Sequence, residues 1–75
     1  MKITKALALE VQMLFEVHCL RHLGKEIQNN YLDGCHLEAD EDGEYYVLLI
    51  LKKPLPESIT IPEEYRSLRV KTKVS

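Results

Sequence analysis

The chain of 75 residues contains no tryptophan, one phenylalanine and two cysteines. Disulfide-stapled secreted domains of this size carry four or more cysteines, so we interpret Cys19 and Cys35 as reduced thiols in a reducing compartment. No apolar run approaches the roughly 20 residues that cross a bilayer. Glu10, Gln12 and Glu16 interrupt the apolar start, which argues against a signal peptide. We therefore expect a cytoplasmic protein with no membrane partner.

The motifs of catalytic and cofactor sites are also missing. The sequence has no glycine-rich phosphate loop, no nucleophile elbow, and neither the CxxC nor the HExxH spacing of zinc sites. A domain this short has little room for a deep pocket. We therefore expect no enzymatic activity and no cofactor.

Charge is distributed unevenly along a chain whose net charge is −2. Residues 1–44 carry four Lys/Arg against nine Asp/Glu, and residues 45–75 carry six against three. This asymmetry is able to orient a head-to-tail contact or to form a weak anion-binding patch. The alternative is two ordinary solvated faces, because exposed charges contribute little individually.

Helix-forming residues predict one long helix from about Thr4 to about Gln28, which Gly24 is able to end early. At 100° per residue this helix has two apolar stripes, whereas a helix lying on a sheet needs one. The first stripe contains Ala6, Leu9, Met13, Val17, Leu20, Leu23 and Ile27. The second stripe contains Leu7, Val11, Leu14 and Phe15.

A β-hairpin is predicted around Asp42-Gly43, with strands at about Cys35–Ala39 and Glu44–Lys52. A two-residue loop would place one set of residues on the core face: Cys35, Leu37, Ala39, Tyr46, Leu48 and Ile50. The outer row would then contain Tyr45, Val47, Leu49 and Leu51. A loop of different parity would exchange the two faces of the second strand.

The C-terminal part predicts a proline-marked loop, one helical turn at Pro62–Tyr65, and a last strand at Leu68–Val74 that alternates apolar and basic residues. The fold class we predict is α+β. One long N-terminal helix packs on a three-stranded, mostly antiparallel sheet, in the order αβββ. The whole chain, residues 1–75, forms a single domain.

One helix covers only one face of a sheet, so the second helix stripe and the outer row are left over. We therefore predict a small protein-interaction module that self-associates, as a homodimer, or binds another protein chain. The alternative is that the C-terminal segments cover one of these surfaces. The predicted interface residues are Leu7, Val11, Leu14, Phe15, Val47, Leu49 and Leu51.

Two further groups of residues support weaker hypotheses. His18 and His22 are four apart on the helix and are the candidate metal ligands, but no further ligand has a fixed spacing, so we predict no metal site. The last strand and its approach carry a basic set that offers an alternative function, weak nucleic-acid binding. The net acidic charge of the chain argues against nucleic acid as a partner. This basic set consists of Arg66, Arg69, Lys71 and Lys73.

Overall fold

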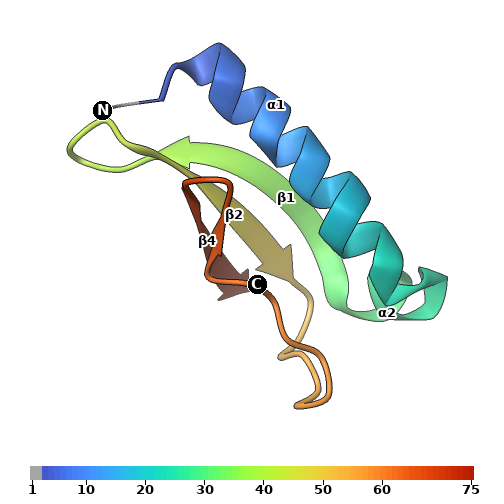
Figure 1. Ribbon diagram of the computed structural model, residues 1–75. Helices are drawn as coiled ribbons and strands as arrows, with labels where there is room; N and C mark the ends of the chain where they lie inside the picture. The colour runs from blue at the N-terminus through green and yellow to red at the C-terminus, as the bar shows by residue number, and fades with distance from the viewer. Residues whose placement is uncertain (1–2) are drawn as a thin grey trace.

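The computed structural model describes residues 3–75 and confirms the α+β class, with helices packed on a four-stranded mixed sheet (Figure 1). The long N-terminal helix spans 19 residues and begins as α1 (Lys5–Phe15). It continues through one π-helical turn, η1 (Glu16–Leu20), and one 3-10 turn, η2 (Arg21–Leu23). A short second helix, α2 (Lys25–Tyr31), leads into the sheet.

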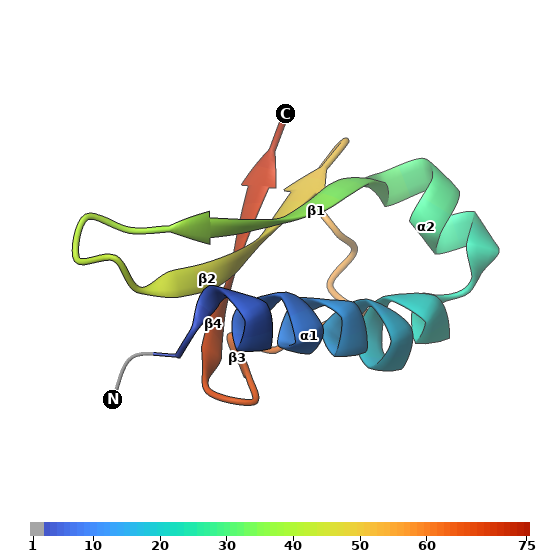
Figure 2. The ribbon, with the colours of Figure 1, turned by 90° about the horizontal axis from the view of Figure 1, so that it is seen from above.

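Local chemistry explains where the long helix begins and ends. The Thr4 hydroxyl accepts a hydrogen bond from the Leu7 N–H at 3.2 Å, which satisfies one of the unpaired donors of the first turn. At the other end Gly24 has φ +86° and ψ 156°, a conformation that is essentially restricted to glycine. The predicted helix to Gln28 is therefore divided at Gly24, and α2 leaves at an angle to α1 (Figure 2).

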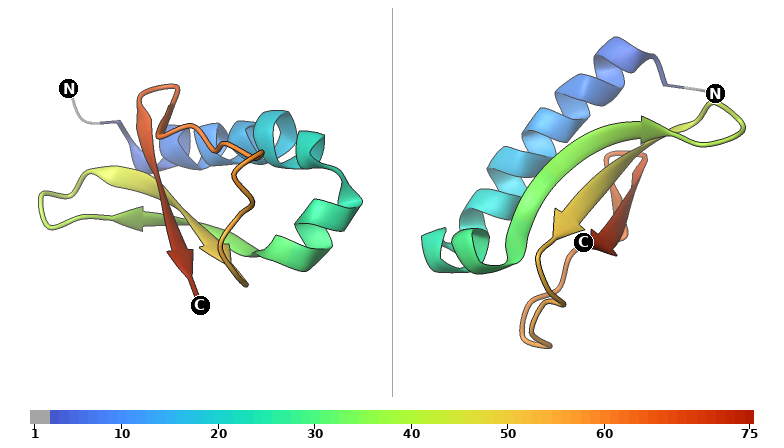
Figure 3. Two further views of the ribbon diagram at one scale, coloured as in Figure 1. Left: turned by 90° about the horizontal axis from the view of Figure 1, so that it is seen from below. Right: turned by 180° about the vertical axis from the view of Figure 1, so that it is seen from behind.

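The sheet contains β1 (Leu32–Ala39), β2 (Tyr45–Leu51), β3 (Glu64–Tyr65) and β4 (Leu68–Val74), in the order β1-β2-β4-β3. The β1–β2 and β3–β4 pairs are antiparallel, whereas β2 and β4 are parallel. The helices lie on one side of this sheet (Figures 1 and 3). Strand β1 forms one edge, a position that matters for the site described below.

Strand β3 replaces the helical turn that the sequence predicts at Pro62–Tyr65, so that prediction is wrong. Arg66 and Ser67 both have positive φ, 47° and 73°, which is the backbone of a tight two-residue hairpin turn. This turn brings Glu64 and Tyr65 back alongside Arg69 and Leu68. The three long strands were predicted correctly, and β3 is the additional fourth strand.

The loop between β1 and β2 has a different parity from the predicted two-residue turn. Asp40 N–H donates to the Glu44 carbonyl at 2.9 Å, so three residues lie between them. Asp40 Oδ1 also accepts from the N–H groups of Asp42 and Glu44, each at 2.9 Å. Ala39 therefore pairs with Tyr45, not with Tyr46, and both faces of β2 are exchanged relative to the two-residue expectation.

The core lies between α1 and the face of the sheet that carries Val47, Leu49 and Leu51. Phe15 is fully buried and packs edge to face against Tyr65, with ring centroids 5.6 Å apart and an interplanar angle of 63°. Three side chains of β2 are buried beneath the helix. The buried residues are Ala8, Val11, Phe15, Leu20, Val47, Leu49, Leu51, Leu68 and Val70.

Candidate interaction surface

The predicted interface residues turn out to be mainly core residues. Five of them are at most 6% exposed, so they contact other parts of the same chain: Val11, Phe15, Val47, Leu49 and Leu51. Leu14 is half-buried, and Leu7 is exposed. The prediction named the wrong face of β2 because the hairpin loop has three residues, and the wrong helix stripe because the second stripe faces the sheet.

The exposed apolar surface of the helix is the other stripe. Leu9, Met13 and Val17 have exposed fractions of 42%, 65% and 41%, and they follow one another at intervals of four residues. At 100° per residue their side of α1 is roughly opposite to Val11 and Phe15. We call Leu9, Met13 and Val17 the outward stripe.

A groove separates α1 from the edge strand β1. Lys5, Leu9 and Gln12 line it from the helix, and the segment 35–39 with Tyr45 lines it from the sheet. Gln12 Nε2 donates to the Cys35 carbonyl at 3.1 Å, which ties the helix to the strand. Leu9 therefore belongs both to the outward stripe and to the wall of this groove.

Alternate residues of β1 direct their backbone N–H and C=O groups away from β2, at the free edge of the sheet. In an antiparallel ladder successive residues alternate between facing the paired strand and facing away from it. Asp40 bonds to Glu44, so Glu38 and His36 face β2, whereas Ala39, Leu37 and Cys35 face away. The Gln12 bond to the Cys35 carbonyl agrees with this phase.

The face of the sheet away from the helices carries a narrow apolar row between charged strands. Tyr46, Leu48 and Ile50 are half-buried on β2. Lys71 Nζ lies 4.4 Å from the centroid of the Tyr46 ring, close enough for a cation–π contact. The flanking strands contribute His36, Glu38, Arg69, Lys71 and Lys73 to this face.

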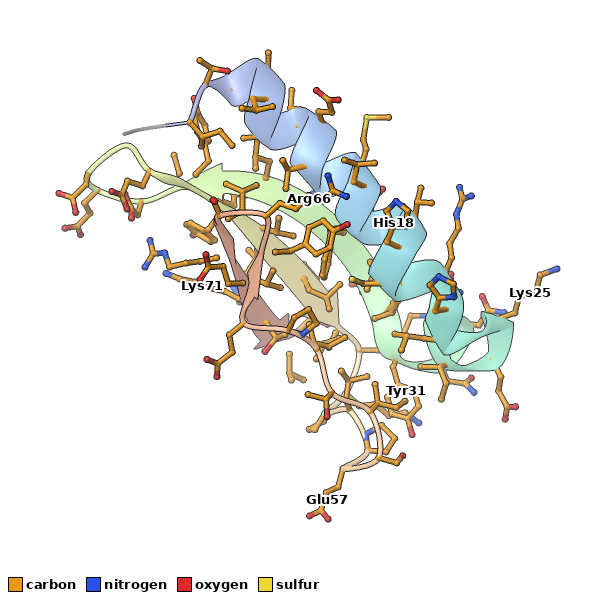
Figure 4. All side chains as sticks on the ribbon, viewed as in Figure 1. His18, Lys25, Tyr31, Glu57, Arg66 and Lys71 are labelled. Atoms are coloured by element: carbon orange, nitrogen blue, oxygen red, sulfur yellow. The ribbon has the colours of Figure 1, made fainter. Side chains whose placement is uncertain are left out.

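The basic residues of the nucleic-acid hypothesis are only partly brought together. Arg69 is paired with Asp40, Nη2 to Oδ2 at 2.6 Å, and Lys71 lies over Tyr46. Arg66 instead lies 5.6 Å from the Tyr65 ring, on the helix side of the sheet, while Lys71 points to the opposite side (Figure 4). Lys73 is exposed on the same face as Lys71. This arrangement adds no support to nucleic-acid binding.

The Asp40 carboxylate joins the β1–β2 loop to β4. The backbone N–H of Glu44 lowers the pKa of Asp40 most, and the Asp42 N–H and the Arg69 guanidinium lower it further. The ionised carboxylate thus fastens the β1–β2 loop to β4 through Arg69.

The candidate metal ligands and the thiols do not form a reactive centre. His18 in η1 and His22 in η2 are both exposed, and within residues 3–75 no three His, Cys, Asp or Glu side chains are grouped to hold a metal ion. Cys19 and Cys35 are free, half-buried thiols. Burial, the charge of Glu16 and a hydrogen bond with Glu16 raise the pKa of Cys35 to about 12, so this thiol is protonated at neutral pH. Burial also raises the pKa of Cys19.

No protein-family model, no curated protein and no solved structure matches this chain. Among residues 3–75 there is no helix of the length and apolar character that crossing a membrane requires.

Proposed function

We propose that this chain is a small interaction module that associates with a second copy of itself through the outward stripe of α1. The observation that carries the proposal is the exposure of Leu9, Met13 and Val17 on one side of a helix whose opposite side is already packed on the sheet. Contiguous exposed apolar side chains on a small domain are typical of protein–protein contact sites.

The energy available from the outward stripe sets a limit on the interface. Burying a Leu, Met or Val side chain fully stabilises a complex by about 1.5–3 kcal/mol, and these three are about half exposed, so each offers about half of that. Two copies together would gain roughly 4–9 kcal/mol. Association costs about 4–15 kcal/mol in lost freedom, so the stripe needs additional contacts to form a stable dimer.

The test compares the oligomeric state of the wild-type protein with that of Met13→Glu by sedimentation velocity. Met13 is the most exposed member of the outward stripe, so the variant should fold normally by circular dichroism and remain a monomer. The matched control is Glu26→Lys, which changes an exposed charge on α2 away from the stripe and should leave the dimer intact.

Two outcomes would contradict the proposal. One is a wild-type protein that stays monomeric at the highest concentration reached. The other is a Met13→Glu variant whose dimer is as stable as that of the wild type, because a buried carboxylate at the interface is expected to be strongly unfavourable. A Val11→Glu variant is not an equivalent test, since Val11 is a core residue and its replacement should unfold the chain.

A further inference from the structure

We infer that the free edge of β1 pairs with β1 of a second copy, antiparallel and centred on Leu37, so that the two sheets become one continuous sheet. The inference rests on the proposed self-association and supplies the additional contacts that the outward stripe requires. The partner that pairs with the edge of β1 is a second copy of this chain.

The first support is the position and composition of β1. It is an edge strand of eight residues, and no strand in the described region 3–75 lies beyond it. Natural edge strands are usually protected by lysine, proline or a covering segment. The start of β1 is protected by a register irregularity between Leu32 and Gly34 and by the exposed Asp33. Between Cys35 and Ala39 there is no irregularity, lysine, arginine or proline, whereas β4 carries Arg69, Lys71 and Lys73. Strand addition is therefore confined to this part of the edge.

The second support is the phase of the backbone. Cys35, Leu37 and Ala39 direct their N–H and C=O groups away from β2, at the free edge of the sheet. An antiparallel partner centred on Leu37 places Leu37 opposite Leu37 and Cys35 opposite Ala39, which are the pairs able to exchange hydrogen bonds. The Cys35 carbonyl already accepts from Gln12 but retains a second lone pair for the partner strand.

The third support is hydrogen-bonding complementarity between His36 and Glu38. A two-fold axis at Leu37 places His36 of each copy opposite Glu38 of the other, in a non-hydrogen-bonded pair where side chains approach closely. An imidazole N–H can donate to a carboxylate across this pair. Centring the pairing on His36 or on Glu38 would instead place identical residues opposite each other. It would also use backbone groups that already bond to β2.

The fourth support is continuity with the outward stripe. Leu9 and Gln12 line the same groove as the segment 35–39, so a second copy that joins this edge meets a surface that adjoins Leu9. The backbone bonds supply register, and the outward stripe supplies apolar area.

Replacement of the facing side chains His36 and Glu38 tests the pairing. His36→Glu places two glutamates opposite each other twice per dimer and should raise the dimer Kd about tenfold, measured by sedimentation equilibrium. The double variant His36→Glu/Glu38→Lys places opposite charges across the two-fold axis and should recover an affinity close to that of the wild type. Circular dichroism of each variant confirms that its monomer is folded.

Hydrogen exchange gives an independent readout without substitution. The amides of Leu37 and Ala39 should become protected only as the protein concentration rises through the dimer Kd. The amides of His36 and Glu38 should be protected at every concentration, because they bond to β2 within the monomer. Concentration-independent exchange at Leu37 and Ala39 while the dimer forms would overturn the pairing.

These results separate the two proposals. If Met13→Glu is monomeric while His36→Glu dimerises as the wild type does, the outward stripe forms the interface and β1 pairing is wrong. If the wild-type protein is monomeric throughout, both proposals fail.

Discussion

Phe15 and Met13 lie two residues apart in α1, on opposite sides of the helix, and their replacement should have very different effects on stability. Phe15 is fully buried and contacts Tyr65 edge to face, whereas 65% of Met13 is exposed. The sequence alone placed Phe15 at the interface and Met13 in the core. The changes in the free energy of unfolding on replacing Phe15 and on replacing Met13 therefore show which side of α1 faces the sheet.

The magnitudes follow from burial. Phe→Ala in a core costs about 3–5 kcal/mol, and a chain of this length is stabilised by only about 4–11 kcal/mol, so Phe15→Ala is too disruptive to interpret. Phe15→Leu removes an edge-to-face contact, about 0.5–1.5 kcal/mol, and leaves a smaller cavity. We expect a total loss of about 1–3 kcal/mol. Met13→Ala should change the free energy of unfolding by no more than about 0.5 kcal/mol.

The assay is urea unfolding followed by far-UV circular dichroism, at a concentration where the protein is monomeric, because a dimer would add its own stability. A double-mutant cycle of Phe15→Leu with Tyr65→Leu should show a coupling energy of about 0.5–1.5 kcal/mol. The reasoning is refuted if Met13→Ala costs as much as Phe15→Leu, or if Phe15 and Tyr65 show no coupling.

Three further predictions concern Gly24, Asp40 and Cys35. Gly24→Ala should destabilise the chain by about 1–3 kcal/mol through backbone strain alone, because a Cβ there would contact nothing within 4 Å; equal melting temperatures would contradict this. The fold lowers the pKa of Asp40, so its stabilising contribution is full above the unfolded value near 3.9 and is lost as the pH falls through the folded value. In thermal melts from pH 7 to pH 2, the difference between the wild type and Asp40→Asn should therefore shrink below about pH 4. With a pKa of about 12, Cys35 should react with iodoacetamide at pH 8 about a thousandfold more slowly in the native than in the unfolded chain, as followed by mass spectrometry, and Glu16→Gln should accelerate the native reaction.

The fold class and most element positions could be predicted from the sequence because they depend on local signals. Helix-forming residues continue to Gln28 and are interrupted by Gly24, Pro54 follows the end of β2, and the alternation in Leu68–Val74 matches a strand whose first apolar residues are buried. The π-helical turn at Glu16–Leu20 had no such signal. A π turn contains more residues than an α turn, so it rotates Leu20 from the outward stripe's side into the core.

A difference of one residue in the length of the β1–β2 loop decides which side chains of β2 face the core. Asp42-Gly43 is typical of a two-residue turn, but the Asp40 carboxylate accepts two backbone N–H groups across the loop and stabilises a three-residue turn, with Gly43 at φ +77°. Because side chains alternate along a strand, this one residue moved Val47 and Leu49 from the outer face to the core. Asp40, at the first position of the turn, was the signal that could have identified the longer loop.

The inference of an uncovered apolar surface did not depend on choosing the correct stripe. Two apolar stripes on one helix leave one exposed whichever of them packs on the sheet, and the structure exposes Leu9, Met13 and Val17. The face of the sheet away from the helices exposes less apolar surface, because its β2 side chains are half-buried and lie beside charged side chains such as Lys71. Of the two surfaces first considered for self-association, the helix therefore keeps the stronger case. The segment 35–39 of the edge strand β1 lines the same groove as Leu9, so the exposed apolar stripe and the sheet edge adjoin each other.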